Sequence, residues 1–179
     1  MTSGEGEHQV RTRFTVADVR WFLDLANKAE IQVWLVGGWG VDALLGGETR
    51  PHTDLDIVVQ QAQHEALRDM LEAHGFSVLL DADHRPWNYV LVDAAGRRID
   101  VHVVRFDEDG YGLYEPGFSY PPGSLVGDGV IGGVPVRCAT PSFQVKDHLG
   151  YEPQDEDLQD VRALCRQYDI PLPAGYEPT

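Results

Sequence analysis

Two aspartates stand one residue apart at the start of an apolar run, DLDIVVQ, which covers residues 54–60. Side chains at positions i and i+2 of a β-strand project from the same face of a sheet. In a strand, Asp54 and Asp56 therefore lie side by side, while Leu55 and Ile57 turn into the core. Two adjacent carboxylates repel each other and have raised pKa values unless a cation lies between them. The run thus predicts a strand with one apolar face and one face of paired acids.

The paired acids make a divalent cation site one interpretation of this strand. Mg²⁺ is the expected cation, because it prefers hard carboxylate oxygens and completes its shell with water and phosphate. The alternative is an exposed strand edge that carries two solvated acids. An Asp-x-Asp motif does not decide between the two by itself.

A second apolar run, RRIDVHVV at residues 97–104, strengthens the metal interpretation. Its alternation places Asp100 and His102 on the face opposite to the valines and the isoleucine. If this strand lies beside the first, Asp100 completes a three-carboxylate cluster that can hold two divalent ions for displacement at phosphorus. The alternatives are that Arg97 or Arg98 pairs with Asp100 and that His102 is a hydrogen-bonded structural residue.

A glycine pair precedes the aspartates by about sixteen residues. Gly37 and Gly38 follow the apolar run QVWLV and precede the helical segment WGVDALLG, which begins at Trp39. Glycine lets the backbone approach a phosphate closely, and the amides of a helix N-terminus point at the anion. An ordinary strand-to-helix turn is the alternative. Together with the downstream carboxylates, however, the pair predicts a triphosphate pocket.

Hydrophobic periodicity predicts an α/β core followed by helices. The first helix begins after Thr15 and buries a stripe made of Val19, Phe22, Leu23 and Ala26. The other expected elements are strands over 32–36, 54–60, 76–81, 88–93, 97–106 and 134–138, and helices over 39–46, 61–75, 141–150 and 155–168. Residues 106–135 are rich in Gly, Pro and Tyr, so they are expected to be mostly loop with a hairpin. We expect a tail over 1–13, a core over 14–140 and a helical extension over 141–179.

The charge balance excludes some partners. The chain has 29 acidic and 14 basic residues, a formal net charge of −15, and no apolar run as long as a membrane span. Nucleic acid is an unsuitable partner for such a chain, because its binding depends on basic patches. The acidity favours either solubility alone or attraction of cations. The N-terminus lacks the apolar segment of a secretory signal, and the two cysteines match no metal spacing, so a cytoplasmic protein is expected.

The glycine pair, the short helix, the Asp-x-Asp strand and the later Asp100 resemble the signature of the DNA polymerase β-like nucleotidyltransferase superfamily. The run GGWGVDALLGGETRPHTDLDI is similar to that of the small antibiotic nucleotidyltransferases, which comprise lincosamide nucleotidyltransferases and aminoglycoside 2″-adenylyltransferases, and it lies nearer to the lincosamide branch. The segments GGVPVRCATPSF and HLGYEPQDEDLQDVRALC resemble the C-terminal part of that group. The resemblance spans residues 33–170. It implies an α/β (α+β) nucleotidyltransferase fold, with a mixed β-sheet flanked by helices and a small C-terminal helical part.

The resemblance also implies a reaction. ATP or another nucleoside triphosphate binds with its phosphates at Gly37, Gly38 and the helix from Trp39, and two Mg²⁺ ions are held by the three aspartates. A hydroxyl of a lincosamide or an aminoglycoside attacks the α-phosphorus, Asp100 takes the proton, and pyrophosphate leaves. Arg50 and His52 flank the strand and are expected to neutralise phosphate charge, with exposed loop positions as the alternative.

The acceptor site and the wider function leave several alternatives open. The acceptor is expected to be a cationic small molecule, which suits the acidic chain, and the protein is expected to be a monomer or a homodimer. Candidates for the acceptor pocket are His148, Tyr151, Trp87, Tyr89, Tyr111 and Tyr114, and Asp42 is expected to brace the glycine turn. The other functions considered are a protein-modifying (AMPylating) antitoxin and a nucleotide-binding module without catalysis. All three carboxylates are present, which disfavours a nucleotide-binding module without catalysis.

Overall fold

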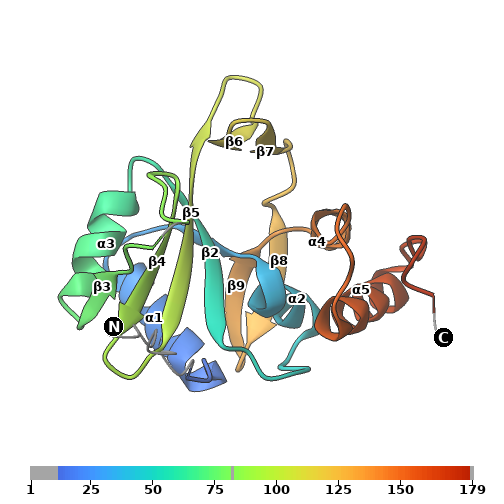
Figure 1. The fold of residues 1–179 in the computed structure, drawn as a ribbon, viewed down its shortest axis with the longest axis horizontal. Helices are drawn as coiled ribbons and strands as arrows, with labels where there is room; N and C mark the ends of the chain where they lie inside the picture. The colour runs from blue at the N-terminus through green and yellow to red at the C-terminus, as the bar shows by residue number, and fades with distance from the viewer. Residues whose placement is uncertain (1–11, 82, 178–179) are drawn as a thin grey trace, which may run out of the picture.

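The computed structural model describes residues 12–81 and 83–177 of the chain (Figure 1). Its strands are β1 (Val33–Leu35), β2 (Asp54–Gln60), β3 (Phe76–Val78), β4 (Asn88–Asp93), β5 (Arg98–Phe106), β6 (Gly112–Glu115), β7 (Phe118–Tyr120), β8 (Gly127–Ile131) and β9 (Val134–Cys138). Its helices are α1 (Val16–Lys28), α2 (Gly37–Leu45), α3 (His64–Glu72), α4 (Pro141–Asp147) and α5 (Asp155–Tyr168).

A mixed sheet forms the centre of the molecule, with strand order β3-β4-β5-β2-β1-β9-β8. β2 is parallel to β5 and β1 is parallel to β9, whereas β1 and β2 are antiparallel. β6 pairs with the end of β5 and with β7, and this β6–β7 hairpin stands above the rest of the sheet in Figure 1. The predicted mixed sheet flanked by helices is therefore confirmed.

The sheet separates two hydrophobic clusters. On one face, Leu55 and Ile57 of β2 and the alternate residues of β5 pack with the buried sides of α1 and α3. On the other face, Val58 and Trp34 pack with Tyr120 of the hairpin and Phe143 of α4. Because β2 alternates, its two aspartates share the second face, where the hydrophobic cover is incomplete.

Helix α1 is held against the sheet by its buried apolar stripe and by contacts with Arg97. Thr15 and Asp18 form a capping box, and the predicted stripe from Val19 to Ala26 is buried. Arg97, in the turn between β4 and β5, makes 2.7 Å contacts with Asp18 and Asp93 and lies over the ring of Trp21. These contacts hold the start of β5 in place.

The C-terminal helices share the main core. α4 and α5 pack against α2, and Val145, Val161 and Leu164 are buried in the same cluster as α1. The predicted hairpin before them is present: Gly132 and Gly133 form its two-residue turn with φ of 55° and 82°, which only glycine adopts readily. The C-terminal helices α4 and α5 are thus packed onto the core through hydrophobic contacts.

Some boundaries differ from the sequence-based expectations. Residues 106–135 contain β6, β7 and β8, so more of this segment is strand than glycine and proline content suggested. α2 begins at Gly37, before the expected Trp39, and α3 is shorter than expected. Of the expected tail, residues 1–11 lie outside the described residues, while Thr12 and Arg13 bond to Ala95 and Glu48. Within the described ranges, no helix is both long and apolar enough to cross a membrane.

Candidate active site

The two acidic strands lie side by side, as the proposed carboxylate cluster requires. β2 and β5 pair in parallel, and their register sets Asp56 directly opposite Asp100 and Asp54 opposite Arg98. Both central aspartates project from the face that carries the second hydrophobic cluster. Arg97, one of the alternative partners considered for Asp100, is instead bound to Asp18 and Asp93. Asp100 accepts a 2.7 Å hydrogen bond from Asn88 Nδ2 on β4.

The proximity of these acids changes their pKa values. Burial, together with the charges of Asp54 and Asp100, raises the pKa of Asp56 well above its usual value. Burial also raises the pKa of Asp100 to about 6, because the bond from Asn88 only partly opposes it. Carboxylates in such a cluster bind protons or a cation tightly, since either relieves their repulsion. The site is therefore electrostatically prepared for positive charge.

The glycine pair lies directly against the carboxylates. Gly37 has φ of 56°, and a Cβ at this position would lie 2.4 Å from Asp56 Oδ2. The amide of Val36 also donates to the backbone oxygen of Asp56 at 3.1 Å. Only glycine satisfies both the left-handed backbone and this close approach. The start of α2 is thereby fixed beside the acids.

The first turn of α2 presents polar backbone to the same region. The N-cap residue, Val36, makes no side-chain cap hydrogen bond within the described part of the chain. The first amides of a helix have no intrahelical acceptor, so they are available to an anion such as phosphate. The nine residues of α2 are long enough to support this N-terminal dipole.

Arg50 and His52 border Gly38. A Cβ on Gly38 would lie 2.4 Å from His52 Nδ1 and 2.7 Å from Arg50 Nη2. Arg50 is held by Asp160 of α5, while His52 is buried and its Nε2 lies 2.6 Å from Asp42 Oδ2. Arg50 therefore lies beside the glycine turn, and the buried pair of His52 and Asp42 supports that turn.

Comparisons with known proteins identify the family of this chain. The profile of the family described as aminoglycoside-2''-adenylyltransferase matches residues 18–164. The chain belongs to the aminoglycoside-2''-adenylyltransferase family. A 2''-aminoglycoside nucleotidyltransferase of Klebsiella pneumoniae is 28% identical over 135 residues, which cover 74% of this chain and 72% of that protein. A lincosamide resistance protein of Staphylococcus haemolyticus is 31% identical over 104 residues, which cover 54% of this chain and 58% of that protein.

Solved structures share the fold. The lincosamide adenylyltransferase LnuA, crystallised with lincomycin, matches with a TM-score of 0.75 and 24% identity over 86% of this chain and 98% of that chain. ANT(2")-Ia in complex with adenylyl-2"-tobramycin matches with a TM-score of 0.70 and 24% identity over 85% and 88% of the two chains. The first structure is an adenylyltransferase by name, and the second holds an adenylylated antibiotic. The nucleotidyltransferase fold expected from sequence is confirmed.

In this member of the aminoglycoside-2''-adenylyltransferase family, the prediction that Trp39 contributes to nucleotide binding needs correction. Its side chain is 1% exposed and packs against His52 with ring centroids 4.5 Å apart, so it cannot contact a nucleotide. Only its backbone amide, in the first turn of α2, remains available. Asp42, expected to brace the turn, does so: it accepts hydrogen bonds from the Thr49 amide and hydroxyl and pairs with His52.

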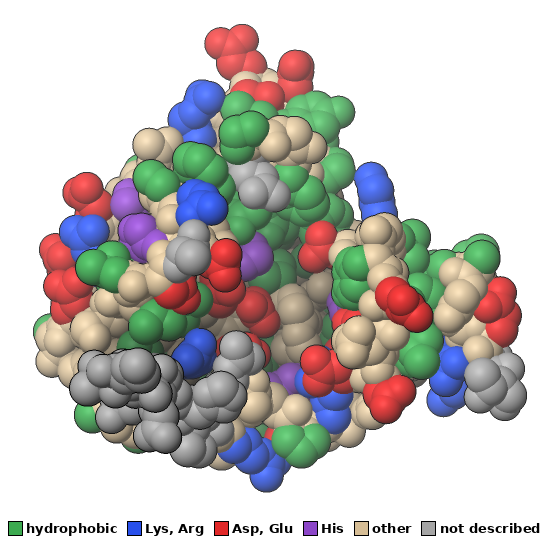
Figure 2. Space-filling model, in the orientation of Figure 1, with side chains coloured by type: hydrophobic (Ala, Val, Ile, Leu, Met, Phe, Trp, Pro, Cys, Tyr) green, Lys and Arg blue, Asp and Glu red, His purple; other side chains and the backbone are tan. Residues whose placement is uncertain are grey.

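A hollow on the acidic face separates the sheet from the C-terminal helices, with acidic side chains on both of its sides (Figure 2). One cavity there, of about 550 Å³, lies between the β6–β7 hairpin and α4. It is lined by Tyr111, Gly117, Phe118, Ser119, Pro121, Phe143, Lys146, Asp147 and Leu149. The pKa of Asp147 is raised, and the charge of Asp147 contributes to the raised pKa of Asp56, so the two acids interact electrostatically.

The expected acceptor residues are dispersed. Tyr111 lines the cavity, and Tyr114 and Trp87 line a neighbouring one of about 370 Å³. Tyr89 is buried in the core beside α3, so it does not face an acceptor. Tyr151 is 52% exposed and bonds to Asp157.

His148 is buried against α4, and its Nδ1 bonds to the Gln144 carbonyl at 2.6 Å. Its Nε2 lies 3.8 Å from Asp157. Both ring nitrogens of His148 therefore face other residues of the protein, which favours a structural role over contact with an acceptor.

Three residues of the site escaped sequence reasoning. Asn88 begins a strand whose alternation, once β4 is paired with β5, directs it to Asp100. Asp147 lies at the end of a short helix, and its orientation depends on how α4 packs. Asp160 is one acid among many on α5. For Asn88 the alternation of NYVLVD was an available signal, whereas the other two required the tertiary structure.

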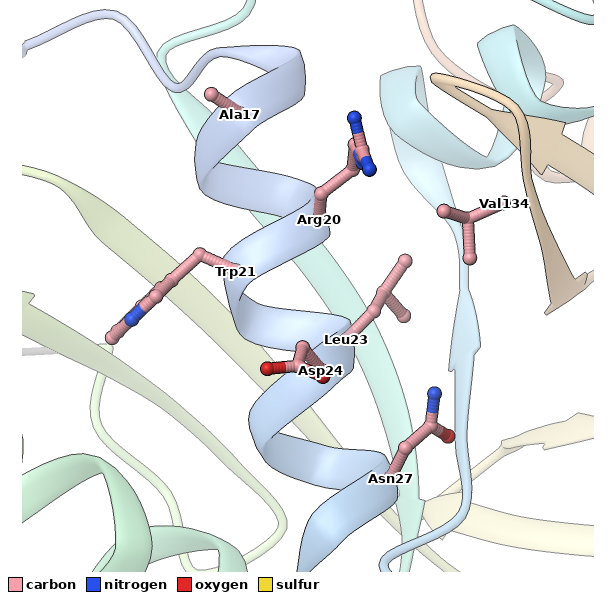
Figure 3. A pocket seen from close by; sticks show the side chains of 7 residues that line it. All are labelled: Ala17, Arg20, Trp21, Leu23, Asp24, Asn27 and Val134. Carbon is pink, nitrogen blue, oxygen red and sulfur yellow. The ribbon is translucent and has the colours of Figure 1, made fainter.

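A further cavity of about 430 Å³ runs along α1, where Arg20 and Leu23 point toward Val134 (Figure 3). Its described lining includes Trp21, Asp24 and Asn27 but none of the predicted site residues. It lies on α1, away from the acidic strands.

Proposed function

We propose that this protein is a Mg²⁺-dependent adenylyltransferase that moves AMP from ATP to a hydroxyl of a small cationic antibiotic, an aminoglycoside or a lincosamide. The observation that carries the proposal is the pairing of Asp56 with Asp100 directly beside the glycine start of α2. Family membership supports the transfer of an adenylyl group, and the names of the relatives supply the two antibiotic classes.

The donor set fits a divalent metal. Ligand atoms of Asp56, Asp100 and His102 lie within 4.8 Å of one another, and the pKa values of both acids are raised in the absence of a cation. Asp54 lies on the same strand face and adds a further carboxylate. When bound, Mg²⁺ neutralises phosphate charge and favours in-line displacement at phosphorus.

The first turn of α2 and Arg50 are assigned to the triphosphate. The absence of side chains at Gly37 and Gly38 lets Asp56, His52 and Arg50 pack directly against the start of α2, whose first amides are free of intrahelical acceptors and can bind phosphate oxygens. The Arg50 guanidinium borders Gly38 and donates to those oxygens, while Asp160 fixes its direction. The buried His52 and Asp42 hold the turn in shape.

Asp100 is assigned as the proton acceptor. The acceptor hydroxyl forms a bond to the α-phosphorus, the bond to pyrophosphate breaks, and the hydroxyl proton passes to an Asp100 oxygen. In the metal-free protein, burial keeps this carboxylate more basic than an ordinary aspartate. Asn88 orients the carboxylate through its 2.7 Å hydrogen bond.

The cavity between the hairpin and α4 is assigned to the antibiotic. Its volume of about 550 Å³ suits a molecule of this size, and its aromatic residues offer flat apolar walls. Asp147, which lines this cavity, adds an acidic group to it. Both antibiotic classes carry amines that are protonated at neutral pH, and an acidic cavity attracts them.

The test is pyrophosphate release with Mg²⁺ and each nucleoside triphosphate, against a panel of aminoglycosides and lincosamides. We expect a product heavier by one AMP, measured by mass spectrometry, and no product with Asp56→Asn. A nucleotide added to a protein instead of an antibiotic would favour the AMPylating alternative. Turnover retained in Asp56→Asn would contradict the assignment of this carboxylate.

A further inference from the structure

We propose that His102 is a ligand of the catalytic metal, so that the site has mixed oxygen and nitrogen donors and binds Mn²⁺ more tightly than Mg²⁺. The inference rests on the proposed function, because it adds a residue to the same metal site. The inference goes beyond the proposed function by assigning a nitrogen ligand and a preference among divalent cations.

The position of His102 on β5 is the first observation. It follows Asp100 by two residues, so both side chains project from the same face of the strand. Its Nε2 lies 3.7 Å from Asp100 Oδ1. This separation is longer than a hydrogen bond, yet two atoms that bind one cation at about 2.1 Å lie roughly 3 to 4 Å apart. With Asp56, the three residues form one group whose ligand atoms are all within 4.8 Å.

The orientation of the imidazole ring is the second observation. His102 Nδ1 lies 3.0 Å from the Tyr120 hydroxyl, and the ring stacks on Tyr114 with centroids 5.0 Å apart and planes 16° apart. Burial raises the pKa of Tyr120, so the hydroxyl stays protonated. With its proton on Nδ1 and donated to the hydroxyl oxygen, His102 presents the lone pair of Nε2 to the carboxylates.

This arrangement matches the general pattern of metal-binding histidines. Such a histidine uses one ring nitrogen for the metal and engages the other with a second residue, which fixes its tautomer and direction. Here β5 provides His102, whereas the β6–β7 hairpin provides its two supports, Tyr114 and Tyr120.

A nitrogen donor alters the preference for cations. Mg²⁺ favours oxygen ligands and keeps its water, whereas imidazole suits the transition metals better. We therefore expect the wild-type protein to bind Mn²⁺ more tightly than Mg²⁺. We expect His102→Gln to weaken Mn²⁺ binding by about 10-fold, with a smaller change for Mg²⁺.

The experiment is pulsed electron paramagnetic resonance of Mn²⁺ bound to the full chain, without nucleotide. A ¹⁴N coupling to the metal is expected in the wild type and absent in His102→Gln. His74→Gln is the matched control, because His74 is a surface histidine beside Trp21, and it should keep the coupling. Calorimetric titrations with Mn²⁺ and Mg²⁺ measure the accompanying affinities.

The outcomes separate this inference from the proposed function. Mn²⁺ that binds in the wild type without a ¹⁴N coupling, or a coupling that persists in His102→Gln, overturns the nitrogen ligand alone. An absence of Mn²⁺ binding, or Mn²⁺ binding that is unchanged in Asp56→Asn, overturns the metal site itself. If His102→Gln does not fold, Tyr120→Phe replaces it, because this variant keeps the imidazole but removes the hydroxyl that orients it. A ¹⁴N coupling that is present in the wild type and altered in Tyr120→Phe supports the nitrogen ligand, and a coupling that is identical in the two proteins overturns it.

Discussion

Arg50 and Asp160 are joined by nitrogen–oxygen contacts of 2.8, 3.1 and 3.2 Å, although 110 residues separate them in the chain. Asp160 is 1% exposed on α5, while Arg50 borders the glycine turn at the start of α2. The carboxylate raises the pKa of the guanidinium despite its partial burial. A C-terminal helix thus sets the direction of a side chain in the proposed nucleotide site.

Replacing Asp160 with alanine should weaken both the fold and nucleotide binding. Loss of the buried carboxylate leaves Arg50 with the exposed Glu156 as its acidic partner among the described residues, so we expect about 2 kcal/mol of destabilisation in urea unfolding and a higher KM for ATP. Glu156→Ala is the control, because it removes a 3.4 Å contact at the surface and should change stability by less than about 0.5 kcal/mol. Equal effects of the two variants would refute the role given to Asp160.

Gly37→Ala should damage the site more than its small size suggests. The new methyl would lie 2.4 Å from Asp56 Oδ2, and the φ of 56° costs about 1–2 kcal/mol for a residue with a Cβ. Displacement of the carboxylate should lower kcat/KM by about 100-fold. Gly47→Ala, where nothing lies within 4 Å of the new atom, is the control for thermal unfolding and kinetics. Normal turnover in Gly37→Ala would show that the close contact is unimportant.

Asp100→Asn should lower activity and raise the stability of the metal-free protein at neutral pH. The folded pKa of about 6 exceeds the usual 3.8, so the folded state holds the proton more tightly and loses stability as the pH rises through 6. The shift corresponds to at most ~3 kcal/mol, reduced by the 31% exposure of the side chain, and we expect about 1–2 kcal/mol.

This gain in stability should shrink toward pH 4 when unfolding is measured in the presence of a chelator. Adenylyl transfer by the variant should fall about 100-fold or more. A variant as unstable as the wild type at pH 7.5 would show that burial of the charge costs little.

The contribution of Asp18 to stability has the opposite pH dependence to that of Asp100. Burial alone would raise its pKa, but the bonds from Thr15 and Arg97 outweigh burial and lower it. Its contribution to stability is therefore present above the unfolded pKa of about 3.8 and is lost as the pH falls through the lower folded value. We expect Asp18→Asn to cost about 1 kcal/mol at pH 7 and little near pH 3, measured by urea unfolding. A constant cost across this range would contradict the ionic contribution.

Local patterns predicted the parts of the site that depend on alternation. β2 spans the predicted residues 54–60, and the alternation of β5 correctly places Asp100 and His102 on one face. Such predictions succeed because the strand period is short and a buried face leaves no other register.

Contacts between distant segments could not be derived in the same way. The pairing of Arg50 with Asp160 depends on how α5 packs on α2, and many acids in the C-terminal part were equal candidates. Trp39 was grouped with the nucleotide site because it follows the glycines, but the helix begins at Gly37 and rotates Trp39 into the core. An error of two residues in a helix start turns a side chain through about 200°.

β5 carries Asp100 as its third residue and pairs with the β6–β7 hairpin at Arg105 and Phe106, its last two residues. The proposed acceptor wall is thus an attachment to the far end of a strand whose other residues are held by β2 and β4. The pairing of Asp56 with Asp100 does not depend on the length of the hairpin. Descendants of such a chain are free to exchange one antibiotic for another at the tip of the hairpin, as long as Tyr114 and Tyr120 continue to hold His102.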